Sequence, residues 1–326
     1  MSVGGDGNVS STTETTPALE EPEPSSQPYF DNATKREYTA AVGQPAYLHC
    51  RVKNLGDRAR SWDDVASRAS LDQLMDESNG AELARLRAVS KPEAGIWLHA
   101  LPSPQLGTLL DNDSLRVAVR LRLGCKICEA HTYMCSMVDA QGRHGLHCVR
   151  SAGRLSRHRG IMRYHPKSLV SANIPSILEP PGLSRNDGKR PDGLTLIPWE
   201  KGRCLLWDAT CVCTFAPSHV ASTIATPGAA AELAAKQKIA KYSGLMDNYI
   251  FVPVATGIWG HDGKTFIKSI GRRMRHCGLD IRSGTFLMQR ISLAVQRGNA
   301  ASALGIFASD AFRSKKHSFF LFIVRL

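Results

Sequence analysis

Two aspartates stand on either side of a short turn in the middle of the chain. Asp192 precedes the apolar run 193–197, and Asp208 lies near the end of a second apolar run, 204–210. Residues 198–202, Pro-Trp-Glu-Lys-Gly, separate the runs, and their proline and glycine favour a turn, so we predict a β-hairpin. Two carboxylates on one small sheet repel each other unless a divalent cation lies between them. The pattern therefore predicts a Mg²⁺ site suited to phosphodiester hydrolysis.

Phosphodiester hydrolysis also requires a cation close to the scissile phosphate, because negative charge develops on the phosphoryl oxygens. The segment after Asp208 has the form of an acid-x-lysine signature, but Thr210 occupies the lysine position. The missing cation is expected from the predicted helix 228–242, as Lys236 or Lys241. The sequence thus predicts Asp192 and Asp208 as metal ligands and one of these lysines as the catalytic cation.

Two further residues lie close to the predicted hairpin. Arg190 is expected to steady the strand or a phosphate, and Glu179 is a candidate third acid. Residues 249–254 read as another buried strand. The order strand, turn, strand, helix, strand indicates an α/β domain.

Cysteines and histidines crowd together between residues 125 and 148. Soft thiolate and imidazole ligands at this density suggest a small zinc site that would organise a polar loop. The candidate ligands are Cys128, which forms a pair with Cys125, and the trio Cys135, His144 and Cys148. The alternative is a set of buried thiols beside surface histidines.

Residues 143–167 form the densest basic run of the chain and directly precede the predicted carboxylate site. We expect salt-dependent phosphate contacts here, and a solvated basic loop is the alternative. The predicted nucleic-acid contacts, besides Arg190, are Arg150, Arg154, Arg157 and Arg159.

The chain of 326 residues has a net charge of +12, but its acids are unevenly placed. Residues 1–35 hold six acids and one base, so residues 36–326 hold 40 basic against 23 acidic residues, a net charge of +17. A basic body predicts a polyanionic partner, DNA first and RNA as an alternative, rather than a membrane or a small-molecule substrate. Nine cysteines favour thiols or metal ligands over disulfides.

No run of eighteen apolar residues and no secretory signal is evident, so we expect a nuclear or cytoplasmic protein. Helices are expected from Ser61 as a capping residue, from Asn79, and from Asp113 as a cap to Gly124. The predicted organisation is a disordered segment 1–35, an incomplete immunoglobulin-like fragment 36–60, a helical region 61–124, a Cys/His-rich basic segment 125–170, an endonuclease-like α/β domain 171–300 and an irregular tail 301–326.

The alternating run 46–52 reads as a half-buried strand. Together with Cys50 and Trp62, it resembles the first strands of an immunoglobulin variable-type domain, closest to the insect defective-proboscis-extension-response family of neuronal surface proteins. The resemblance covers about residues 29–59, and no second cysteine motif follows. A fragment of two or three strands cannot bury both faces of a sandwich, so we interpret it as a remnant; a cell-surface protein is the alternative.

Several long strings in order resemble the C-terminal part of a non-LTR retrotransposon polyprotein with a restriction-like endonuclease. They are IPSILEPPGLSRNDGKRPDG at 174–193, LLWDAT at 205–210, APSH at 216–219, FVPV at 251–254 and FLMQRISLAVQRGNA at 286–300. The resemblance covers about residues 62–299. It implies a small mixed sheet flanked by helices that cuts DNA with Mg²⁺ held by Asp192 and Asp208.

In that family a Cys/His knuckle precedes the Pro-Asp motif, and Cys135, His144 and Cys148 match its positions. Tyr133 stands where a cysteine is expected and Arg143 where a histidine is common. No reverse transcriptase region is present. The expected function is therefore a retroelement-derived, metal-dependent DNA endonuclease, and a nucleic-acid-binding relic without catalysis is the competing hypothesis.

Overall fold

The computed structural model describes residues 29–30, 52–53, 58–134, 136–151, 153–183, 188–256 and 259–307. The chain divides after Ala69 into two compact units. In the first, β1 (Tyr29–Phe30) pairs antiparallel with β2 (Val52–Lys53), and α1 (Arg58–Glu77) begins. Because α1 begins at Arg58, the prediction that Ser61 caps this helix is wrong. Most of the predicted immunoglobulin-like fragment and of the predicted disordered segment lies outside the described residues.

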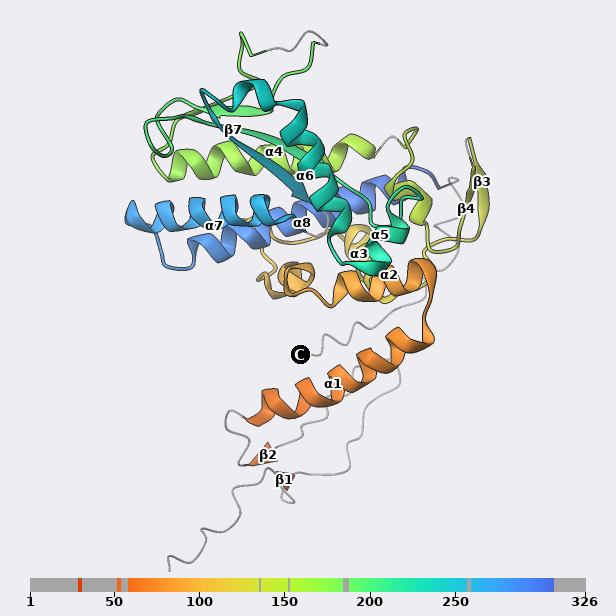
Figure 1. Cartoon of the computed structure of the whole chain (residues 1–326). Helices are drawn as coiled ribbons and strands as arrows, with labels where there is room; N and C mark the ends of the chain where they lie inside the picture. Colours follow the sequence, from red (N-terminus) through yellow and green to blue (C-terminus); the bar gives the residue numbers. More distant parts are fainter. Residues whose placement is uncertain are drawn as a thin grey trace, which may run out of the picture. The chain divides into compact units, whose positions relative to one another are not determined.

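The second unit is a mixed α/β structure whose helices surround a four-stranded mixed sheet (Figure 1). Its strands are β3 (His131–Tyr133), β4 (Ser136–Val138), β5 (Ser176–Leu178), β6 (Gly193–Thr195), β7 (Leu205–Cys211) and β8 (Ile250–Thr256). Its helices are α2 (Gly80–Val89), η1 (Pro92–His99), α3 (Asn112–Leu123), η2 (Arg143–Leu146), α4 (Arg154–Ser171), α5 (Val220–Ala225), α6 (Ala229–Lys241), η3 (Ser243–Leu245), α7 (His261–His276) and α8 (Ser283–Leu304).

The predicted hairpin is confirmed. The sheet order is β5-β6-β7-β8, with β5, β6 and β7 antiparallel and β8 parallel to β7. Between β6 and β7, Glu200 and Arg203 form a bridge around Lys201 and Gly202, which both have positive φ, +49° and +73°. A two-residue turn in which both residues have positive φ has a twist that matches the twist of the flanking strands. The β7–α6–β8 order predicted from the sequence is also present.

Alternate residues of β7 face two different layers of helices. Trp207 and Leu205 pack in the main core with α4, α7 and α8, whereas Leu206 packs with Tyr242 and with Ile239 of α6. The period of two in a strand explains this division. In Figure 1, α6 crosses one face of the sheet and α4 lies behind the other. Asp208, an even-numbered residue of β7, therefore belongs to the α6 face.

Small residues bring the helices around α8 close together. A Cβ on Gly298 would lie 2.6 Å from the Cα of Arg157, and one on Gly271 would lie 2.7 Å from the Cα of Gly284. These glycines let α8 pack against α4 and α7 respectively. The helix also continues to Leu304, so the prediction of an irregular tail from residue 301 is wrong for its first four residues.

The helical region before the sheet follows the predicted signals with one change. As predicted, α2 begins at Asn79, which stands at its N-cap position, and Gly124, with φ of +72°, ends α3. The cap of α3 is Asp111 rather than Asp113, because the side chain of Asp111 accepts a hydrogen bond of 2.8 Å from Ser114 N. Within the described residues, no helix has the length and apolar character needed to cross a membrane.

Candidate carboxylate site

The sheet brings Asp192 and Asp208 next to each other. Gly193 pairs with Trp207 in the antiparallel register, and the two aspartates flank this pair, with Asp192 directly before Gly193 and Asp208 directly after Trp207. Asp192 N donates to Trp207 O at 3.0 Å. Its side-chain Oδ2 accepts a hydrogen bond of 2.6 Å from Ala209 N, where β7 extends beyond β6. The Asp192 carboxylate thus accepts a hydrogen bond from a backbone N–H of β7 that has no partner in β6. This bond fixes the carboxylate beside Asp208.

Lys238 of α6 supplies the cation at this site. Its Nζ forms a charged hydrogen bond with Asp208 Oδ1, and the Asp208 side chain is only 4% exposed. Lys236, predicted from the sequence, is exposed on the same helix. The buried face of α6 includes Ala231 and Ala234, and Lys238 follows these at helical spacing. That spacing is the sequence signal that could have singled out Lys238.

The other predicted lysine supports the loop before Asp192. Lys241 Nζ donates to Tyr242 Oη at 2.7 Å, and Tyr242 Oη donates to the carbonyl of Arg190 at 2.9 Å. Arg190 in turn pairs through its guanidinium with Glu179 Oε2. The structure therefore gives Lys241 and Arg190 contacts outside the carboxylate pair.

Glu179 stands in the same row as the two aspartates. In the β5–β6 register it falls opposite Asp192, and its N donates to Asp192 O at 2.9 Å. Its side chain is 64% exposed and is engaged by Arg190. Glu179 is thus placed at the edge of the site and turned toward an arginine.

His158 of α4 is the second group that sequence reasoning did not assign to the site. Its Nε2 lies 3.1 Å from Asp192 Oδ2. This hydrogen bond raises the pKa of the imidazole, and the charges of both aspartates add to the effect. No spacing rule connects His158 to Asp192, because the contact is made between a helix and a strand 34 residues apart.

The donor set fits Mg²⁺. Among the described residues, protein donors engage Oδ2 of Asp192 and Oδ1 of Asp208, so one oxygen of each carboxylate would be available to a cation. Mg²⁺ prefers hard oxygen ligands, keeps several waters and is commonly held by one or two carboxylates. Among the described residues, no group of three or more Cys, His, Asp or Glu could hold a metal ion, so the two aspartates would act without a third such ligand.

The zinc prediction falls partly outside the described residues, because Cys135 is one of those left out. Cys128 is buried, its Sγ contacts Asp139 O at 3.5 Å, and burial raises the pKa of its thiol to about 11. The ring of His144 packs edge-on against His147 at 5.3 Å, and Cys148 is buried. In the described part of this segment the Cys128 thiol thus lies in a buried environment that disfavours its charged form.

The predicted basic contacts divide between the surface and the interior. Arg150 and Arg159 are exposed, and the side chain of Arg154 lies outside the described part of the chain. Arg157 is only 7% exposed and donates to Leu146 O, so the structure places it in the interior rather than on the basic surface of α4. The close packing of α4 on Gly298 of α8 is the reason.

A basic ridge does run along the exposed side of α4. Arg159, Arg163 and Lys167 follow one another at intervals of four residues, and all three are exposed. Residues four apart lie on one face of a helix. The ridge lies on the same helix as His158, which contacts Asp192.

No protein-family model matches the chain, and no curated protein matches it. The carboxylates, the lysine and the ridge are therefore interpreted from their own geometry and chemistry.

Proposed function

We propose that the chain is a divalent-metal-dependent DNA endonuclease with a restriction-endonuclease-like arrangement of its sheet. One observation carries the proposal: the Asp192 carboxylate accepts from the backbone N–H of Ala209, the residue after Asp208, and Lys238 bonds to the Asp208 carboxylate. Two adjacent carboxylates and one ammonium are what phosphodiester hydrolysis needs from the protein. The resemblance of several sequence strings to retrotransposon endonucleases supports the same proposal.

Each residue has a separate task in this proposal. Asp192 and Asp208 hold Mg²⁺, which when bound polarises the phosphate and activates water. Lys238 lies on Asp208, where its ammonium orients a water or offsets the charge that develops on a phosphoryl oxygen. His158 holds the Asp192 carboxylate in position. Ala209 N, which donates to the same carboxylate oxygen, adds a backbone constraint.

The substrate class follows from charge. The ridge of Arg159, Arg163 and Lys167 runs along α4, the helix that also carries His158, and would follow a phosphate backbone. The excess of basic residues after residue 35 favours a polyanion as the partner.

A nicking assay on supercoiled DNA with Mg²⁺ tests the proposal. Asp208→Asn and Lys238→Met should each lower the nicking rate by about 10²–10³, the size of effect seen on removing one stabilising group. Lys236→Met is the matched control, because this exposed lysine lies on the same helix and should leave the rate unchanged. Equal rates for Lys238→Met and Lys236→Met would remove Lys238 from the mechanism.

The second candidate is a nucleic-acid binder without catalysis. It is favoured by the pairing of Asp208 with Lys238 and of Asp192 with His158, since these pairs offset the carboxylate charges without a metal. Absence of nicking by the unmodified chain, with salt-sensitive DNA binding retained, would leave only this candidate.

A further inference from the structure

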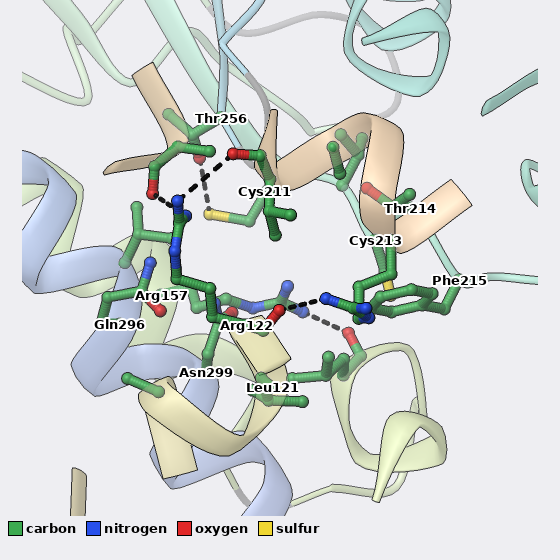
Figure 2. Close-up of a pocket in the computed structure, with 18 of the residues that line it drawn as sticks. Leu121, Arg122, Arg157, Cys211, Cys213, Thr214, Phe215, Thr256, Gln296 and Asn299 are labelled. Carbon is green, nitrogen blue, oxygen red and sulfur yellow. Dashed lines mark hydrogen bonds between the residues drawn. The ribbon is translucent and has the colours of Figure 1, made fainter. Parts of the chain in front are cut away.

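A cavity of about 140 Å³ lies at the carboxyl ends of β7 and β8 (Figure 2). Cys211 and Thr256, the last residues of these parallel strands, are register partners and both line it. Ligands of α/β proteins commonly bind at the carboxyl ends of parallel strands. The volume has room for several waters at ~30 Å³ each, and hence for a tetrahedral oxyanion.

Among the described residues, three arginines line this cavity, Arg85, Arg122 and Arg157, and no aspartate or glutamate does; we call it the arginine cavity. Glu82, which is not part of the lining, pairs with Arg85 and shares its other oxygen with Arg143 at 3.0 Å. The Glu82 carboxylate therefore pairs with two arginines, Arg85 and Arg143, although Glu82 itself does not line the cavity. The described residues that line the cavity therefore carry more positive than negative charge.

The other two arginines have neutral partners. Arg122 donates to the carbonyls of Ala94 at 3.2 Å and Val89 at 3.4 Å, while Arg157 donates to a carbonyl of η2. Burial, with the charge of Arg85, lowers the pKa of Arg122. Arg157 is only 7% exposed, and in the described structure its Nε has no hydrogen-bond partner. Buried cations of this kind are costly unless a charged partner is present.

The two thiols on the wall do not supply the missing negative charge. Burial raises the pKa of Cys211 and of Cys213, so both remain protonated at neutral pH. Figure 2 shows these thiols on the same lining as Arg122 and Arg157. An anion from outside the chain is the remaining way to balance the arginines.

We propose that the arginine cavity binds a phosphate group. Guanidinium groups match the geometry and charge of phosphate oxygens, and the neutral side chains Thr214, Gln296 and Asn299 offer further polar atoms on the wall. The phosphate comes either from free inorganic phosphate or from the end of a nucleic-acid strand. The proposal does not depend on the carboxylate site cutting DNA, because binding is measured without Mg²⁺.

Calorimetric titration of the full chain tests this site, with three probes at matched ionic strength. The probes are inorganic phosphate, a short single-stranded oligonucleotide with a 5′-phosphate and the same oligonucleotide without it. Gln296→Glu places a carboxylate in the wall and should weaken phosphate binding by at least about tenfold, because like charges are then brought together. Arg157→Met should weaken it as well. Gln105→Glu, an exposed residue outside the cavity, makes the same charge change and should have no effect.

Each result decides between the sources of the phosphate or against the site. Binding of inorganic phosphate that is abolished in Gln296→Glu supports a site for the free ion. Selective binding of the 5′-phosphorylated oligonucleotide, with the same effect of Gln296→Glu, supports a strand end. No binding at millimolar concentrations, or equal binding by Gln296→Glu and Gln105→Glu, would show that the arginines are purely structural. Circular dichroism of each variant identifies any that fails to fold, and Gln296→Glu keeps the test valid if Arg157→Met does.

Discussion

At the scale of single residues, the two aspartates are held by different means. Asp192 stands just before β6 and is fixed by a backbone N–H of β7 and by His158, whereas Asp208 lies within β7 and is fixed by Lys238. The Asp208 side chain is almost fully buried, so its charge requires a partner. A lysine that is itself 22% exposed suits this role, because it can shift toward a substrate without leaving an unsolvated ammonium.

Gly193 allows the strand that follows Asp192 to approach β7 closely. A Cβ at this position would lie 2.0 Å from Cζ2 of Trp207, a fully buried ring. Gly193→Ala should therefore lower the free energy of unfolding by about 1–3 kcal/mol, the usual cost of overpacking a core. Urea denaturation measures this change.

Gly244→Ala is the control for that experiment, because no atom lies within 4 Å of its added Cβ. If both glycine variants unfold at the same urea concentration, Trp207 moves aside freely and the close packing has no energetic consequence.

At the scale of elements, two helices on opposite faces of the sheet complete the site. α6 contributes Lys238 from the face that carries Asp208, and α4 contributes His158 from the other face. α4 also has two distinct sides: Ile161 and Leu169 enter the main core, while the basic ridge remains exposed. The helix thus positions a site residue and offers a surface for phosphates.

Removal of the α4 ridge should weaken DNA binding in a salt-dependent way. The triple variant Arg159→Ala, Arg163→Ala and Lys167→Ala removes three positive charges that would each neutralise a phosphate. The slope of log K against log salt concentration should then become shallower by about 0.9 for each phosphate that the protein no longer neutralises. Binding isotherms at several salt concentrations measure it.

The matched control changes three exposed basic residues of α7, Lys268→Ala, Arg272→Ala and Arg275→Ala. The net charge changes equally in the two triple variants. If the slope of the α7 variant falls as much as that of the α4 variant, binding responds to total charge and the ridge has no special role.

At the scale of the whole molecule, burial in the core disfavours the protonated, charged form of His165. His165 of α4 is completely buried, its ring packs edge-on against Phe266 at 5.9 Å, and within the described structure neither ring nitrogen has a partner. Burial lowers the pKa of this imidazole to about 4. The folded chain therefore keeps His165 neutral at pH values where the unfolded chain protonates it.

Stability should consequently fall with acid between pH 6.5, the ordinary histidine pKa, and about pH 4. In this window the unfolded state binds more protons, so protonation favours unfolding, and the loss is about 3 kcal/mol. Above pH 6.5 His165 contributes no pH dependence. His165→Leu should remove this part of the dependence, as measured by urea denaturation from pH 4 to 7.

His99→Leu, at an exposed position, is the control and should retain the dependence of the unmodified chain. If His165→Leu shows the same fall in stability as His99→Leu, other groups cause the acid sensitivity.

The predictable parts of this protein are those specified by local signals. The turn at Lys201 and Gly202, the cap at Asn79 and the end of α3 at Gly124 each follow from a few neighbouring residues. The capping error at Asp111 is equally local, since the two candidate caps lie two residues apart. The two apolar runs and the turn between them then sufficed to predict the hairpin of β6 and β7 that carries Asp208 and follows Asp192.

The choice of cation could not be made in this way. Lys236, Lys238 and Lys241 lie within two turns of one helix, and only the rotation of α6 against the sheet selects Lys238. Arg157 likewise belongs to a basic run in the sequence, but the packing of α4 on α8 buries it.

The sequence by itself therefore determined the hairpin, the acid pair and the basic character of the chain, because turns, strand periodicity and charge depend on nearby residues. Only the tertiary structure decided which lysine and which histidine meet the acids and which arginines surround a cavity. Those contacts join residues on different elements, and their distances depend on how helices pack against a sheet.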